Sequence, residues 1–281
     1  MTDNKRHIEN PEDIDWAYFW GKKLESKKDR QKNWDKAAPH FHKSNKRDDY
    51  RKTLLNSLKI TKEDTVLDIG CGEGSITIPI AKKAKSVTGL DSSSGMLKIL
   101  NEKCEKEGID NVTTIQKPIE EISLDELGHF DIIVASRSLN SIIPIERVLK
   151  TINEIANKYV YITLFGPDNW RIERDFQESI GNNPKDFPPY TYIIQILYNL
   201  DIYANVERLP ITSHREYNNI GEAMDNGKFR VDLLSDEEIE KLKAYLRDIL
   251  KKDSKTGKLY NERDVADWIL LWWKKDGKWI D

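Results

Sequence analysis

The chain has 281 residues, of which 38% are hydrophobic and 33% charged, and its formal net charge is -3. That length suits one large domain or two small ones, and that charge argues against a dedicated nucleic-acid binder. No stretch approaches the roughly 18 consecutive apolar residues of a transmembrane helix, and the N-terminal residues lack the apolar core of a secretory signal. The two cysteines, Cys71 and Cys104, fit neither a disulfide framework nor a metal knuckle, so we expect a cytoplasmic protein without a bound metal.

The first sixty residues differ in charge from the rest of the chain. They hold fifteen Lys and Arg against ten Asp and Glu, and they are unusually rich in aromatic side chains. We predict an N-terminal helical cap over residues 1–49, followed by a domain over 50–281. Its core would span 50–166, and its C-terminal strands with a helical insertion 167–281. The basic character of the cap is typical of a solvated helical face, although a docking arm for a phosphate-bearing partner stays open.

From Asp64 onward, apolar runs alternate with segments of helical periodicity. This alternation predicts an α/β fold with a mostly parallel sheet that carries helices on both faces. The expected helices lie near 74–84, 94–107, 119–127 and 144–157. The expected strands are 65–70, 86–91, 111–116, 130–136 and 159–165, with two later ones at 201–209 and 264–273. Periodicity alone does not assign the continuous apolar run at 264–273, which we interpret as a buried strand.

The insertion is predicted between the last two strands, where residues 234–252 read "LSDEEIEKLKAYLRDILKK". Ser235 can cap this helix while Glu238, three residues later, reaches back to the backbone of Ser235. The insertion is therefore expected to be helical.

A glycine-rich turn, "VLDIGCGEG" at 66–74, joins the first strand to the first helix. A nucleoside-triphosphate loop needs a lysine after its glycines, and none is present. A dinucleotide turn needs a third glycine where this chain has Ser75. About twenty residues further on, Asp91 ends the second strand, where a carboxylate can accept both hydroxyls of a ribose. Asp68, just before the turn, could orient the loop or meet a ligand ammonium group.

The combination V-L-D-I-G-C-G-E-G, then G-L-D-x-S-x-x-M-L, resembles class I S-adenosylmethionine-dependent methyltransferases over about residues 50–166. The resemblance implies a Rossmann-like seven-stranded sheet, S-adenosyl-L-methionine as cofactor and S-adenosyl-L-homocysteine as product. It also implies that the cofactor is bound by Asp68, Gly70, Cys71, Gly72, Asp91, Ser92 and Met96.

The chain departs from this family after the third strand. The usual Gly-Asp-Ala-Glu motif aligns with Lys117–Glu120, so Pro118 replaces the acid that contacts the adenine amino group. The backbone at Ile119 or the side chain of Glu120 must then serve instead.

The end of the fourth strand, "ASRSLNS", lies where the family places groups beside the transferring methyl. The resemblance places Ser136, Arg137 and Asn140 on the acceptor side. Ser136 is counted among the cofactor-binding residues, and Arg137 and Asn140 are the catalytic candidates. Arg137 could equally be a surface cation. His40, in "APHFHK", is a further catalytic candidate; His40 and His42 lack a third ligand for a metal.

Two substrate classes stay open. Cap and insertion could close a pocket over the carboxyl end of the sheet, which favours a small-molecule acceptor. The alternative is an RNA or protein methyltransferase that docks its substrate on the basic, aromatic N-terminal arm. We expect the small-molecule enzyme, because no RNA-binding module and no overall basic charge are visible.

Overall fold

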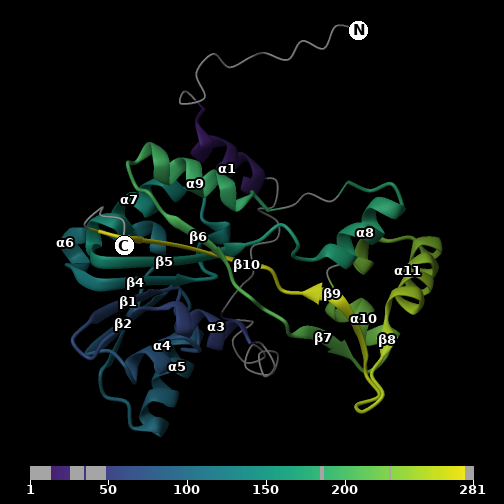
Figure 1. Ribbon diagram of the computed structural model, residues 1–281, viewed down its shortest axis with the longest axis horizontal. Coiled ribbons are helices and arrows are strands. Elements are labelled where there is room, and N and C mark those ends of the chain that lie inside the picture. The colour runs from purple at the N-terminus through teal and green to yellow at the C-terminus, as the bar shows by residue number, and fades with distance from the viewer. Residues whose placement is uncertain (1–13, 26–34, 36–48, 184–186, 228, 276–281) are drawn as a thin grey trace, which may run out of the picture.

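The computed structural model describes residues 14–25, 35, 49–183, 187–227 and 229–275. Its centre is a seven-stranded sheet in the order β3-β2-β1-β4-β5-β10-β6 (Figure 1). β10 runs antiparallel to both of its neighbours, and the other four pairings between adjacent strands are all parallel. The predicted mostly parallel sheet is confirmed. Its strands are β1 (Thr65–Ile69), β2 (Ser86–Asp91), β3 (Val112–Gln116), β4 (Phe130–Ser136), β5 (Ala156–Phe165), β6 (Asn205–Arg208) and β10 (Trp268–Lys274).

Helices cover both faces of this sheet. Because successive side chains of a strand point to opposite faces, β4 sends Ile133 and Ala135 into one core and Ile132 and Val134 into the other. The first core is closed by α1 (Trp16–Glu25), α7 (Ile145–Ile155) and α9 (Tyr190–Asn199), and the second by α3 (Tyr50–Ser57) and α4 (Thr77–Ala81). α5 (Ser94–Glu107) packs beside α4 in a smaller cluster.

Several predicted boundaries shift. The helix expected at 119–127 is two short pieces, η3 (Ile119–Glu121) and α6 (Leu124–Leu127), separated by extended backbone at Ile122 and Ser123. The run at 264–273 is a buried strand as expected, but it begins at Trp268, because Asp264 and Val265 belong to the preceding β9 (Leu259–Val265).

The insertion between β6 and β10 contains the expected helix, α11 (Asp236–Ile249), together with a shorter helix, α10 (Ile220–Asn226), and a small sheet that we did not predict. That sheet has the order β7-β9-β8, with β7 at His214–Tyr217 and β8 at Lys251–Lys252. β7 and β8 are short and mostly polar, and β9 is polar between its ends, so these strands lack the apolar alternation that reveals a strand. The capping box of Ser235 and Glu238 is present at the start of α11.

One helix from outside the insertion completes its core. α8 (Arg171–Ser179) follows β5, yet its Ile172 and Phe176 pack with Phe229, Leu242 and Leu246 of the insertion. We call α8 and residues 214–265 the insertion lobe. In Figure 1 this lobe stands beside the central sheet, on the side where the chain leaves β5 and returns into β10.

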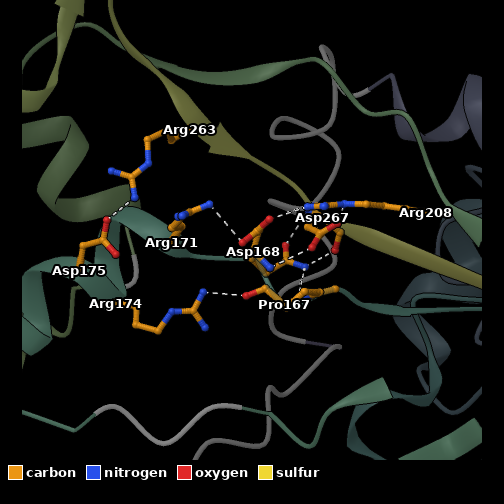
Figure 2. A network of polar contacts seen from close by, with 10 residues as sticks. Pro167, Asp168, Arg171, Arg174, Asp175, Arg208, Arg263 and Asp267 are labelled. Atoms are coloured by element: carbon orange, nitrogen blue, oxygen red, sulfur yellow. Dashed lines mark hydrogen bonds and ion pairs between the residues drawn. The ribbon is translucent and has the colours of Figure 1, made fainter. Parts of the chain in front are cut away.

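A polar network fastens the lobe to the sheet (Figure 2). The buried carboxylate of Asp267 accepts bonds from Arg208 Nε at 2.7 Å and from the backbone N–H of Asp168 at 2.9 Å. Arg208 Nη2 also donates to Asp168 at 2.6 Å, and Arg171 of α8 donates to the same carboxylate at 3.3 Å, which connects the network to the lobe. Within the lobe, Arg263 of β9 pairs with Asp175 of α8. Asp267 therefore joins the end of β6, the start of β10 and the exit from β5.

Of the predicted N-terminal cap over residues 1–49, the structure describes Ile14, Asp15, α1, Asp35 and Asp49. The other residues of the cap lie outside the described part of the chain. α1 is anchored where Trp20 Nε1 donates to the carbonyl of Ile142 at 2.6 Å. Asp35 accepts bonds from Ser93 Oγ and the Gly95 N–H, at the start of α5. Within the described part of the chain, no helix has the length and apolar character that a membrane span requires.

Candidate active site

The glycine turn follows β1 at the carboxyl edge of the sheet. Gly70, Gly72 and Gly74 all have positive φ, at 70°, 54° and 84°, a conformation that costs other residues about 1–2 kcal/mol. A Cβ on Gly70 would overlap the Cβ of Ser138, and one on Gly74 would overlap Leu100. A Cβ on Gly72 would meet nothing among the described atoms. The turn is thus tightly packed at Gly70 and Gly74, whereas there is open space beside Gly72.

Two carboxylates flank the turn. Asp91 accepts the Gly72 N–H with Oδ2 and the Ser93 N–H with Oδ1, both at 2.9 Å. Asp68 is buried, and its Oδ2 accepts the Thr77 hydroxyl at 2.6 Å, whereas its Oδ1 has no partner among the described residues. Burial raises the pKa of Asp68 to about 7, an effect that the bond from Thr77 opposes and the nearby charge of Asp91 reinforces.

Cys71 lies in the same turn. Burial, with the charges of Asp68 and Asp91, raises the pKa of its thiol well above the ordinary value. A thiol that stays protonated is a poor nucleophile. Cys71 therefore acts as a small apolar group that contacts α5 rather than as a reacting sulfur.

The segments that follow β2 and β3 supply buried apolar side chains to the site. Met96, at the start of α5, is 2% exposed, and Ile119 is buried after β3. Ser93 caps α5 by accepting the Met96 N–H at 3.1 Å. At the family's acid position stands Pro118, with Glu120 two residues later; the carbonyl of Glu120 accepts a bond from Arg147.

The loop after β4 lies beside the turn. Arg137 has a left-handed backbone with φ at 60°, and its guanidinium lies 4.4 Å from the ring centre of Tyr50. Tyr50 in turn hydrogen bonds to Ser136 Oγ at 2.8 Å and to Thr163 Oγ1 at 2.6 Å. Asn140 is buried, and its Oδ1 accepts the Phe165 N–H at 2.9 Å. These bonds tie β4, β5 and α3 together at one edge.

Most of these segments border one cleft of about 1660 Å³. One wall, which we call the cofactor half, is formed by residues of the ranges 68–76, 90–96 and 117–120. A few residues within these ranges do not border the cleft. The opposite part, the acceptor half, lies over β4, β5 and β10 and is faced by the insertion lobe. The lobe contributes Glu173, Arg174, Gln177, Met224, Asp225, Gly227 and Arg230–Leu234. Single-ligand pockets measure about 300–1,000 Å³, so this cleft has room for two molecules.

The structure brings together every predicted site residue that it describes. Asp68, Gly70, Cys71, Gly72, Asp91, Ser92, Met96, Ile119, Glu120, Ser136, Arg137 and Asn140 all border the cleft. His40 and His42 lie outside the described residues. No group of three His, Cys, Asp or Glu side chains suited to a metal is found within the described ranges.

Our sequence analysis missed the residues that line the acceptor half from distant segments. Phe165, Trp170 and Trp268 border it, and so does Glu173 from the lobe. Phe165 and Trp268 stand at the carboxyl end of β5 and at the start of β10, and strand ends at that edge were the available signal. Tyr50 and the residues of α8 showed no sequence pattern that indicated a place near the site.

An open sheet with this strand order, one antiparallel strand and a glycine turn after β1 defines a Rossmann-like methyltransferase fold. Comparison with known proteins agrees. A family model described as a methyltransferase domain matches residues 60–209, more than half of the chain. The chain therefore belongs to this family, the class I S-adenosylmethionine-dependent methyltransferases, and S-adenosylmethionine is its cofactor.

Individual relatives are more distant. A Haemophilus influenzae protein described as uncharacterized is 28% identical over 246 residues, which cover 86% of this chain and 89% of that protein. A mitochondrial ribosomal RNA small subunit methyltransferase of Arabidopsis thaliana is 24% identical over 221 residues, or 75% of this chain and 52% of that enzyme. A crystal structure from Bacillus halodurans superposes with a TM-score of 0.52 at 14% identity, covering 80% of this chain and 98% of that one. That similarity concerns the fold alone.

Proposed function

We propose that the protein transfers a methyl group from S-adenosylmethionine to a small molecule held in the acceptor half of the cleft. The observation that carries this proposal is the second wall. A cofactor bound at the glycine turn faces the insertion lobe, whose Met224, Val231, Leu233 and Leu234 border the same cleft. Two facing walls suit a compact acceptor, because enclosure excludes water and aligns the reacting groups.

The residues present fit the cofactor. Asp91 would bind the two ribose hydroxyls, and the open backbone at Gly72 leaves room for the methionine portion. The buried Oδ1 of Asp68, which lacks a partner among described atoms, would accept a bond from the cofactor ammonium group. Met96 and Ile119 would pack against the adenine, with Ser92 at its rim. With Pro118 in place of the acid, backbone at Ile119 or the carboxylate of Glu120 would meet the adenine amino group.

When bound, the cofactor supplies an electrophilic methyl group to a lone pair of the acceptor. The chain needs chiefly to position the acceptor in line and to keep water out. Ser136, Arg137 and Asn140 are the proposed residues for this task, because they lie at the end of β4 and in the loop after it, between the two halves of the cleft. The hydrogen bonds through Tyr50 and Phe165 hold their loop in place. His40 remains a proposed base from the cap.

The alternative acceptor is RNA, since the Arabidopsis relative is a ribosomal RNA methyltransferase. The described acceptor half gives this reading little support. It mixes Arg137, Arg174 and Arg230 with acidic Glu173, Asp225 and Asp232, whereas a phosphate backbone selects for unbroken positive charge.

The test is to follow isotopically labelled methyl groups from S-adenosylmethionine. The purified protein is incubated separately with a low-molecular-mass cell filtrate and with total RNA. We expect label in a low-molecular-mass product, and none with the Asp91→Ala protein. Label that accumulates in RNA, and that falls steeply with added salt, would replace the small-molecule proposal with the RNA alternative.

A further inference from the structure

The acceptor half contains buried hydrogen-bond donors that lack acceptors. Asn140 Nδ2 and Trp268 Nε1 are both buried, and neither has a hydrogen-bond partner within the described structure. Both residues border the cleft, and Asn140 is 5% and Trp268 7% exposed. Leaving such N–H groups unpaired is costly, so each marks a position where a ligand acceptor belongs.

The orientation of the Asn140 amide follows from its neighbour. Its oxygen is the atom that accepts the Phe165 N–H at 2.9 Å, because a backbone N–H cannot bond to an NH₂ group. Trp268 is the cross-strand partner of the same Phe165, and the two rings lie 4.8 Å apart. Phe165 thus positions both donors. Its backbone N–H holds the amide of Asn140, and its ring packs against the ring of Trp268.

Around these donors the acceptor half is aromatic. Trp170 lies 4.6 Å from Phe165 and 5.5 Å from Phe187, and Phe187 lies 4.9 Å from Phe165, measured between ring centroids. All four rings, including Trp268, border the cleft. Aromatic faces at these separations suit a flat ring that joins the cluster edge-on or stacked.

The same part of the cleft carries positive charge and strained backbone. Arg137 lies over the rings of Tyr50 and Trp268, and Arg174 donates to the Pro167 carbonyl (Figure 2 shows the second contact), so two cationic side chains border this half of the cleft. The facing carboxylate of Glu173 is already bonded to Arg215. Of the described non-glycine residues with positive φ, Arg137, Trp170 and Arg230 border this cleft. Strain of this kind collects at sites that bind ligands.

We propose that the acceptor is a planar aromatic molecule that carries a carboxylate or another anionic oxygen. Its ring lies in the cluster of Phe165, Trp170, Phe187 and Trp268, and its oxygen accepts the N–H groups of Asn140 and Trp268. This inference rests on the proposed function, and it names the substrate class of the same cleft.

Binding of simple probes to the protein saturated with S-adenosylhomocysteine tests the proposal. Calorimetry compares cinnamate, which is flat and anionic, with cyclohexylpropionate, which lacks the flat ring, and with phenethylamine, whose charge is reversed. We expect cinnamate to bind at least about tenfold more tightly than either comparator. Trp268→Phe keeps the ring and removes the donor, and Asn140→Asp keeps the bond to Phe165 and removes the donor. Each should weaken cinnamate about tenfold or more, since a bond to a charged acceptor is lost.

Trp272→Phe is the matched control, because Trp272 lies on the same strand but donates to Glu207 outside the cleft. It should leave cinnamate binding unchanged, and all three variants should bind S-adenosylhomocysteine as the parent does. Equal affinity for the three probes, no binding of cinnamate, or unchanged affinity in both donor variants would overturn the substrate class. Failure of the parent protein to bind S-adenosylhomocysteine would instead overturn the proposed function.

Discussion

The carboxylate of Asp91 and the backbone N–H of Gly72 are joined by a hydrogen bond of 2.9 Å, so the end of β2 holds the open part of the glycine turn. This bond places an acidic group where the proposed ribose lies, and it couples cofactor affinity to the shape of the turn.

Asp91→Ala should lower the affinity for S-adenosylhomocysteine at least about tenfold. Each hydrogen bond to a charged group contributes roughly 1.5–3 kcal/mol, and the variant loses the bonds to the ribose as well as the support of Gly72. Titration calorimetry measures the change. Asp110→Ala, an exposed acid outside the cleft, is the control and should bind normally. Normal binding by Asp91→Ala would remove Asp91 from the cofactor site.

The glycines of the turn should respond differently to alanine. Both Gly70→Ala and Gly72→Ala incur the cost of positive φ, about 1–2 kcal/mol. Gly70→Ala also forces its methyl group into Ser138, whereas the methyl of Gly72→Ala enters open space. Thermal unfolding should therefore show a clearly larger loss of stability for Gly70→Ala. In calorimetry, Gly72→Ala should weaken cofactor binding while the fold persists. Equal melting temperatures would contradict the packing described here.

Asp68 should make stability depend on pH. Burial raises its pKa from 3.8 to about 7, so between these values the unfolded chain has lost the proton that the folded chain retains. The free energy of unfolding contributed by this group must then fall as pH rises from about 4 to about 7, and stay level above. Asp68→Asn keeps an oxygen for the Thr77 hydroxyl but cannot ionise. Without cofactor, the melting temperature of the variant minus that of the parent should be larger at pH 8 than at pH 5. A difference independent of pH would show that Asp68 is ionised throughout.

The link between the lobe and the sheet should depend on Asp267. Asp267→Ala removes the acceptor of Arg208 Nε and of the Asp168 N–H, and should lower the free energy of unfolding by roughly 2–4 kcal/mol. Denaturant unfolding measures this change. Asp175→Ala breaks the ion pair of Asp175 with the half-exposed Arg263, and should cost less than about 1 kcal/mol. Similar losses in both variants would show that Asp267 is not the main attachment.

Much of the cofactor half could be predicted from sequence because it is built from local patterns. The strand, the three glycines and the capped helix after Asp91 are adjacent in the chain, and each depends on conformational preferences that a short segment carries by itself. The strands β1, β4 and β5 were recognisable as well, since their burial on both faces of the sheet requires continuous apolar runs.

The acceptor half was decided by tertiary structure. Phe165 and Trp268 are separated by about a hundred positions and meet because β10 runs antiparallel beside β5. The small sheet of the insertion lobe consists of mostly polar strands, whose pairing depends on the partner rather than on the strand's own composition. α8 packs into a lobe whose other residues come later in the chain. Sequence alone thus determined the cofactor turn and the class of fold, because both arise from local backbone and burial patterns. The tertiary structure decided the aromatic wall and its two unpaired donors, because they arise from contacts between distant segments.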